Sequence, residues 1–327
     1  MSGDAARDVL ADGVRRGVFP SAAAEVGTSA GPEWHEALGA AYDTIFDLAS
    51  LTKVIATTTD VMARVHDGSL RLDWPLSEFF PEWQGDQRSE VTVLDLLEHA
   101  SGLSARLVDR PPTGRREFEH DICTMKLEYP PRSKSIYSDL GFILLGFIVD
   151  VGSVWLQPDL CFNPPPELRE RCAPTRPMRD DLRRGRLLRG EVHDNYAAAL
   201  GGAAGHAGLF GTASAVGSFA RLILRAAQGD GTLPPPFTPD LVKRFTAKST
   251  VPGSSRAAGW DTMLPTSSCG TRMSSRAFGH VGFTGTSLWI DPAQDRYFVL
   301  LTNRVNGGGT LDEMRDVRRA FHDAYIG

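Results

Sequence analysis

Cysteine is scarce in this sequence, and its few copies are far apart. The four residues are Cys123, Cys161, Cys172 and Cys269, and no Cys-x-x-Cys pair occurs among them. This spacing argues against a structural zinc site or a disulfide framework, and it suits a reducing compartment or simple burial of the thiols. We expect neither a metal ion nor a cofactor.

The chain also lacks a strong charge of one sign and a long hydrophobic run. With 35 Lys and Arg against 40 Asp and Glu, its net charge is −5, which argues against a nucleic-acid-binding protein. No apolar run reaches the roughly 20 residues of a membrane-spanning helix. Residues 1–4 open a polar segment without a signal-peptide pattern, so we expect a cytoplasmic location. An exported protein whose leader had been removed would begin in the same way, and the oligomeric state stays open.

What the chain does have is enough apolar sequence, 42% of 327 residues, for a large core. This length suggests two domains, or one domain with a large insertion. Strand patterns occur near the two ends, at residues 22–28, 34–40, 287–291 and 296–302. We therefore predict one sheet built from both ends, with a long helical insertion between them. The predicted α/β domain comprises residues 1–60 and 225–327, and the mostly helical domain comprises residues 61–224.

One stretch combines a serine and a lysine at the start of a predicted helix. Apolar residues recur at three- and four-residue spacing from Val54 to Val65 and predict a helix that begins near Ser50. Ser50 and Lys53 would then lie on one face, with the amine within reach of the hydroxyl. The Ser50 N–H would be an unpaired donor at the helix N-terminus. Alone, this pair favours a capping serine and a solvated lysine; a nucleophile with its base needs partners elsewhere.

Two other stretches carry polar groups at the ends of apolar segments. Tyr137, Ser138 and Asp139 precede residues 142–149, which are apolar on every side and predict a fully buried helix. In isolation Tyr137 is more often a packed ring with a satisfied hydroxyl. Residues 279–285, Gly-His-Val-Gly-Phe-Thr-Gly, precede a predicted strand.

Three features stay open at this stage. His193 and Asp194 could form a general base pair, but a structural hydrogen-bonded turn is favoured. The glycine-rich run at 201–208, which includes His206, implies close approach of backbone to backbone. The arginines between residues 169 and 189 favour a solvated surface segment over a binding patch.

The three stretches together resemble the serine β-lactamase and penicillin-binding protein superfamily. Its motifs are Ser-x-x-Lys, Tyr-x-Asn or Ser-x-Asn, and Lys-Thr-Gly. This sequence has, in that order, Ser50-Leu51-Thr52-Lys53, Tyr137-Ser138-Asp139 and His280-Val281-Gly282, with similar flanks at residues 99–103, 205–210 and 301–304. The tyrosine form resembles the class C branch, which includes esterases and D-amino-acid peptidases. The resemblance implies an antiparallel sheet flanked by helices, a mostly helical domain and an active site in the cleft between them.

The resemblance also implies roles for individual residues. Ser50 would attack a carbonyl and form an acyl-enzyme. Lys53, its pKa lowered by burial and neighbouring positive charge, would hold or take the Ser50 proton. Tyr137 would relay a proton to the leaving group and activate water; which of the two is the formal base stays open. The backbone N–H groups of Ser50 and Phe283 would form the oxyanion hole.

Three departures from the family pattern bear on the substrate. Asp139 replaces asparagine, and its charge could balance Lys53 or repel anionic substrates. His280 and Val281 replace the Lys-Thr pair that helps hold a substrate carboxylate, and they supply less positive charge and fewer donors. Asp139, His280, Val281 and Gly282 are the predicted substrate-binding residues. Residues 150–162 look short, which should open one side of the pocket or lower stability.

We therefore expect a serine hydrolase that acts on a small-molecule ester or amide. Hydrolysis of short-chain carboxylic esters is favoured, because the carboxylate anchor is altered. The alternative is a β-lactamase or a D-alanyl-D-alanine carboxypeptidase. A non-catalytic binding or sensor protein with the same fold is a third hypothesis, against which the intact set of Ser50, Lys53 and Tyr137 argues.

Overall fold

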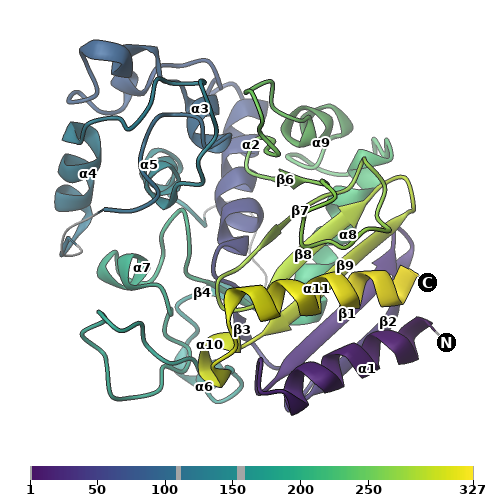
Figure 1. Ribbon diagram of the computed structural model, residues 1–327. Coiled ribbons are helices and arrows are strands. Elements are labelled where there is room, and N and C mark those ends of the chain that lie inside the picture. Colours follow the sequence, from purple (N-terminus) through teal and green to yellow (C-terminus); the bar gives the residue numbers. More distant parts are fainter. Residues whose placement is uncertain (1, 108–111, 153–158, 327) are drawn as a thin grey trace.

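A six-stranded antiparallel sheet lies at the centre of the larger layered part of the molecule (Figure 1). The computed structural model describes residues 2–107, 112–152 and 159–326. The strand order is β2-β1-β9-β8-β7-β6. The bounds are β1 Ala22–Thr28, β2 Gly31–Leu38, β6 Asp261–Thr262, β7 Phe278–Val281, β8 Ser287–Asp291 and β9 Arg296–Thr302. β1 pairs with β9 along its length, so the two ends of the chain share one sheet, as predicted.

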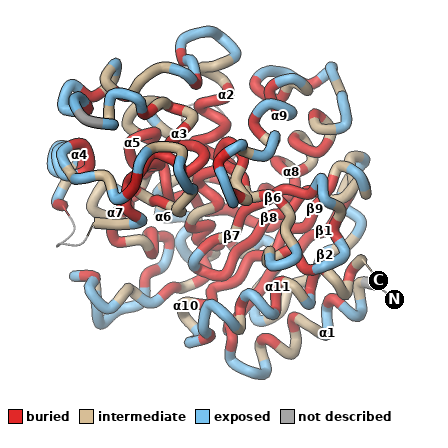
Figure 2. The backbone as a smooth tube through the Cα atoms, turned by 45° about the horizontal axis from the view of Figure 1, so that its top comes forward, coloured by how far each residue is buried: buried red, intermediate tan, exposed pale blue. Residues whose placement is uncertain are grey.

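Side chains alternate between two apolar layers along the central strands. On β1, Ala22, Ala24 and Val26 pack with α1 (Ser2–Arg15) and α11 (Leu311–Ile326). Ala23 belongs to the other core, which includes Phe219 of α8 (Ala213–Ala227). Because side chains of a strand point alternately to the two faces, a strand covered on both sides is buried throughout. In Figure 2 the central strands β1, β9 and β8 are buried, whereas the edge strand β2 is intermediate to exposed.

The helices between residues 53 and 149 form a second region, at the upper left and centre of Figure 1. It contains η1 Lys53–Thr57 (a π-helical turn), α2 Thr58–His66, η2 Leu76–Glu78, η3 Asp86–Glu90, α3 Val93–Leu97, α4 Arg115–Thr124 and α5 Asp139–Val149. α5 is buried over most of its length, because nearly all of its side chains are apolar. Thr92 caps α3 by accepting from Asp95 N–H.

Shorter elements complete the chain. They are α6 Pro166–Arg169, α7 Asn195–Ala199, α9 Pro239–Thr246 and α10 Arg304–Gly307, with a small sheet of β3 Phe46–Asp47, β5 Leu209–Gly211 and β4 Leu160–Phe162. None of the helices in the described ranges combines the length and the apolar character that crossing a membrane requires.

Most predicted elements match the structure, and the differences lie at their ends. The strands predicted at 22–28, 287–291 and 296–302 have these bounds, whereas β2 covers 31–38 rather than 34–40. The predicted boundary at residue 225 falls inside α8, which packs on the sheet; the division into domains stays a prediction. Residues 153–158 of the short 150–162 segment lie outside the described residues.

Candidate active site

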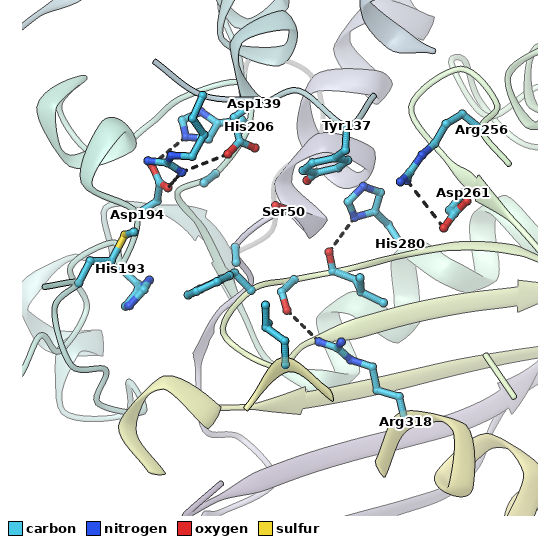
Figure 3. A pocket seen from close by; sticks show the side chains of 18 residues that line it. Ser50, Tyr137, Asp139, His193, Asp194, His206, Arg256, Asp261, His280 and Arg318 are labelled. Carbon is cyan, nitrogen blue, oxygen red and sulfur yellow. Dashed lines mark hydrogen bonds and ion pairs between the residues drawn. The ribbon is translucent and has the colours of Figure 1, made fainter. Parts of the chain in front are cut away.

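A pocket of about 420 Å³ opens beside Ser50 and is lined by side chains from distant parts of the chain. Figure 3 shows Tyr137 and His280 on one side of Ser50 and Asp139 and Asp194 on the other. The structure therefore brings the three sequence stretches together in one pocket. All of the predicted substrate-binding positions, 139 and 280–282, line it.

A tight turn holds Ser50 at the entrance to η1. The preceding residue, Ala49, has a φ of 48°, a conformation that an alanine adopts only at a cost in energy. Its N–H donates to Asp47 Oδ1 at 2.8 Å. Lys53 N–H donates to the Ser50 carbonyl at 3.1 Å, which starts the predicted helix. On this turn Lys53 Nζ reaches Ser50 Oγ at 3.2 Å.

Lys53 is fully buried, and its amino group has two further partners. Nζ donates to Asp139 Oδ1 at 2.8 Å and to the His206 carbonyl at 3.1 Å. Burial by itself lowers the pKa of Lys53, but the charge of the Asp139 carboxylate and the contacts with Asp139 and Tyr137 together outweigh burial, and the pKa is raised. The prediction of a lowered pKa is therefore wrong. Lys53 is held as an ammonium ion.

Asp139 lies between two cations. Its Oδ1 accepts from Lys53, and its Oδ2 accepts from Arg106 Nη1 at 3.1 Å. Burial would raise the pKa of Asp139, but the positive charge of Lys53 holds it below its ordinary value. Of the two roles considered for this aspartate, balancing the charge of Lys53 matches the contacts.

Tyr137 packs among histidine rings and cations on the opposite side of the pocket. Its ring centroid lies 4.6 Å from that of His99 and 5.9 Å from that of His280. Lys53 Nζ lies 4.8 Å from the Tyr137 centroid, and Arg256 Cζ lies 5.2 Å from it. The tyrosine therefore has positive charge on two sides of its ring.

His280 is buried and neutral, as the sequence predicts for a residue without a carboxylate partner. Its Nδ1 lies 2.9 Å from the Val281 carbonyl oxygen. Its pKa is well below the ordinary value because of burial and the charges of Lys53 and Arg256. Protonation of His280 by mild acid, which would help to hold an anionic substrate, is thus opposed by its surroundings.

The end of β7 lies directly against the turn that carries Ser50. Thr284 Oγ1 donates to the Asp47 carbonyl at 2.8 Å, and Thr286 Oγ1 donates to the Leu48 carbonyl at 2.9 Å. A Cβ on Gly282 would lie 2.7 Å from the Leu48 carbonyl oxygen, so only glycine fits there without a shift. These contacts fix the backbone of Phe283 relative to that of Ser50.

Two backbone N–H groups remain unused at this junction. Within the described ranges, neither Ser50 N–H nor Phe283 N–H donates a hydrogen bond to a protein acceptor. Backbone donors that stay free beside a nucleophile are what an oxyanion hole requires. Both groups are the ones that the sequence pattern indicates.

Several charged residues of the pocket are absent from the sequence prediction. Arg106, Arg256 and Arg318 line it, and Arg318 donates to the Gly282 carbonyl at 2.8 Å. Arg106 and Arg256 belong to none of the motifs described above. No local signal in the sequence identifies either residue, because their contacts are with distant segments.

The residues considered as a pair at 193 and 194 have different partners. Asp194 Oδ1 lies 2.8 Å from His206 Nε2 and also caps α7 by accepting from Ala197 N–H. His193 donates its backbone N–H to Asp47 and stacks on Phe283 with ring centroids 5.7 Å apart. The histidine partner of Asp194 is therefore His206, and both His193 and Asp194 line the pocket.

Comparison with known families agrees with this geometry. The model of the family described as "Beta-lactamase" matches residues 6–151 and 156–322. The chain belongs to the β-lactamase family. This family member is 30% identical over 310 residues to an Escherichia coli (strain K12) protein with the provisional name D-alanyl-D-alanine carboxypeptidase, covering 80% of this chain and 69% of the relative. The predicted superfamily is thus confirmed.

Solved structures give the same fold for this β-lactamase family member. A penicillin-binding protein homologue from Caulobacter crescentus has a TM-score of 0.74 at 22% identity, covering 99% of this chain and 97% of the other. A class C β-lactamase from Rhodobacter sphaeroides has a TM-score of 0.74 at 18% identity, with 98% of both chains covered. The predicted β-lactamase/transpeptidase-like fold is confirmed.

Proposed function

We propose that this protein is a serine hydrolase that forms an acyl-enzyme on Ser50. The observation that carries the proposal is the contact of Ser50 Oγ with Lys53 Nζ at 3.2 Å inside a pocket that also holds Tyr137. Ser50 Oγ attacks the substrate carbonyl carbon. The N–H groups of Ser50 and Phe283 donate to the oxygen that becomes negative.

We assign the proton-accepting step to Tyr137 rather than to Lys53. Lys53 is held as an ammonium ion by Asp139 and has no free lone pair to accept the Ser50 proton. The Tyr137 hydroxyl takes that proton as it gives its own proton to the leaving group. The ammonium of Lys53, 4.8 Å from the centroid of the Tyr137 ring, stabilises negative charge that develops on the tyrosine during this transfer. In deacylation the same group removes a proton from water.

Two findings change the balance between the substrate hypotheses. The charge of Asp139 is compensated by Lys53 and Arg106, so it does not leave a free negative charge in the pocket. Arg256 supplies a guanidinium next to Tyr137 and His280, and its ion pair with Asp261 is 3.7 Å long. This distance is too long for a hydrogen bond. A substrate carboxylate could therefore take the place of Asp261 as the partner of Arg256.

We favour a substrate that ends in a carboxylate, such as a peptide with a terminal D-amino acid, over the neutral ester that the sequence favoured. The name of the Escherichia coli relative, D-alanyl-D-alanine carboxypeptidase, describes release of such a terminal residue. A short-chain ester is the second candidate, because the exposed apolar side chains of Phe283 and Leu311 line the pocket. These side chains would pack against an uncharged acyl group.

The test has two stages. A fluorophosphonate should label the native protein on Ser50 and leave Ser50→Ala unlabelled, because only a serine hydroxyl can form the adduct. Equal labelling of both proteins would overturn the proposed nucleophile. Next, kcat/KM is measured for a D-Ala-D-Ala peptide, the same peptide with its terminal carboxyl amidated, nitrocefin and p-nitrophenyl butyrate. We expect the free carboxylate to be preferred to its amide, and preference for the butyrate ester would favour the second candidate.

A further inference from the structure

Arg106 lies between two partly buried carboxylates, Asp139 at the start of α5 and Asp194 at the N-cap of α7. Its Nη1 is 3.1 Å from Asp139 Oδ2 and 3.1 Å from Asp194 Oδ2. Its Nη2 donates to Asn195 Oδ1 at 2.8 Å, and its Cζ lies 3.9 Å from the centroid of the Tyr196 ring. Figure 3 shows the two carboxylates, Asp139 and Asp194, on the same side of Ser50. One guanidinium therefore joins the start of α5 to the start of α7.

The charges along this cluster alternate in sign. Lys53 is followed by Asp139, then Arg106 and then Asp194, whose other oxygen lies 2.8 Å from His206 Nε2. The carbonyl of His206 returns to Lys53 at 3.1 Å, which closes a ring of contacts. Without Arg106, two partly buried carboxylates would face each other without a cation between them, which is unfavourable because like charges repel.

The family pattern shows why this cation matters. Asparagine at position 139 could contact Lys53 through its amide oxygen without bringing a charge. An aspartate brings a charge that must be compensated inside the protein. Arg106 provides the compensation, and it is itself fixed by Asp194, Asn195 and Tyr196. The aspartate and the arginine thus form one unit.

We propose that Arg106 is a positioning residue for the reaction at Ser50: by pairing with Asp139 and Asp194 at once, it lets an aspartate orient Lys53 toward the serine. This inference rests on the proposed acyl-enzyme function. Arg106 does not touch the reacting atoms. It acts by keeping the Asp139 carboxylate at the distance where Lys53 Nζ contacts both the carboxylate and Ser50 Oγ.

The test measures the second-order rate of labelling by a neutral fluorophosphonate in four proteins: native, Arg106→Gln, Asp139→Asn and the double variant. Arg106→Gln should lower the rate by about tenfold or more, because a misplacement of catalytic groups by ~1 Å can cost ~10²-fold. The double variant should label within about threefold of Asp139→Asn alone, since the uncompensated carboxylate is gone. Arg106→Lys should lie between native and Arg106→Gln, because it keeps the charge and loses the fork of donors.

Arg171→Gln is the matched control. Arg171 is also 33% exposed in its side chain and also pairs with two aspartates, Asp43 and Asp159, but it does not line the pocket. It should label at the native rate.

Three outcomes would overturn the inference. The first is labelling of Arg106→Gln at the native rate. The second is an equal loss of labelling rate in Arg106→Gln and in the double variant. The third is a loss of labelling rate in Arg171→Gln as large as that in Arg106→Gln. If Arg106→Gln does not fold, the same comparison is made between Arg106→Lys and Arg106→Lys with Asp139→Asn, where rescue is again required. Labelling of Ser50→Ala would instead contradict the proposed nucleophile, so the two failures are distinguishable.

Discussion

The two sides of the Ser50 pocket differ in how completely their polar groups are paired. On one side, which we call the paired wall (Lys53, Asp139, Arg106, Asp194 and His206), every charged group has an oppositely charged partner within 3.1 Å. Of its buried side-chain polar atoms, His206 Nδ1 has no hydrogen-bond partner in the described structure.

On the other side, which we call the open wall (Tyr137, His99, His280 and Arg256), the pairing is incomplete. His99 Nε2 and His280 Nε2 are buried without a hydrogen-bond partner among the described residues. Arg256 has one ion pair, at 3.7 Å.

This difference in pairing indicates a different role for each wall of the pocket. A network in which every charged group has an oppositely charged partner favours one arrangement and fixes the groups attached to it, here Lys53. Buried donors and acceptors without protein partners carry a cost in free energy that a bound ligand can relieve. We infer that the paired wall orients the reacting groups and that the open wall receives the polar end of the substrate.

The largest expected effect comes from removing the two residues at which the walls meet. Lys53→Ala and Tyr137→Phe should each lower kcat by about 10³-fold or more, and the double variant should lose much less than the product, because groups that act as a unit are not additive. Steady-state kinetics on the preferred substrate of the panel measures this. Near-native turnover by Tyr137→Phe would contradict the assignment of the proton-accepting step.

How far the sequence predicts this site depends on whether the information is local. The spacing of Ser50 and Lys53 and the exact order of the three motifs are visible along the chain, and the structure brings these residues into one pocket. Strands 287–291 and 296–302 were equally visible, because their residues suit a sheet buried on both faces.

Properties that depend on pairing across the fold could not be predicted in this way. Arg106 contacts Asp139 and Asp194, which are 33 and 88 residues away in the sequence. The pKa of Lys53 is raised because two distant partners, Asp139 and Tyr137, together outweigh the effect of burial. A rule based on burial and neighbouring positive charge therefore gave the wrong sign.

The next largest effect should come from disturbing the turn after β7, which places Phe283 N–H beside Ser50. A methyl group at Gly282 would lie 2.1 Å from Thr286 Oγ1 and 2.7 Å from the Leu48 carbonyl. Gly282→Ala should shift Phe283 N–H away from Ser50 and lower kcat by about 10²-fold, the cost of one oxyanion-hole donor. Gly231→Ala is the control, because nothing lies within 4 Å of a Cβ there. Equal activity of the two variants would argue against the assigned donor.

A smaller and more selective effect is expected on the open wall. Arg256→Gln should lower kcat/KM for the D-Ala-D-Ala peptide by about 10-fold, which corresponds to about 1.4 kcal/mol of lost transition-state binding. The amidated peptide and p-nitrophenyl butyrate should change by less than about twofold, since they carry no carboxylate for the guanidinium. Arg256→Lys should keep part of the preference. An equal loss on all three substrates would mean that Arg256 acts on Tyr137 and not on the substrate.

The smallest expected effect concerns stability in acid, where His280 of the open wall and Asp47 beneath Ser50 act with opposite sign. The pKa of His280 is well below its ordinary value of 6.5. Below pH 6.5 the unfolded chain therefore binds a proton that the folded protein does not, and stability falls as the pH falls. Burial raises the pKa of Asp47 to about 6. The folded protein then binds the proton first, and acidification from pH 6 toward the ordinary value of 3.8 stabilises it.

Urea unfolding at about pH 7, 6 and 5 can separate these two contributions, because each variant removes one proton-binding difference between the folded and unfolded states. His280→Gln should reduce the loss of unfolding free energy on acidification by at most about 1.4 kcal/mol per pH unit. Asp47→Asn should instead make the loss steeper by a similar amount below pH 6. Each variant also changes stability at neutral pH, but that offset leaves the slope with pH unaffected. A loss that is unchanged or steeper in His280→Gln would show that His280 is not the neutral, buried group that leaves the open wall ready for a substrate, and a loss that is unchanged or shallower in Asp47→Asn would contradict the raised pKa of Asp47.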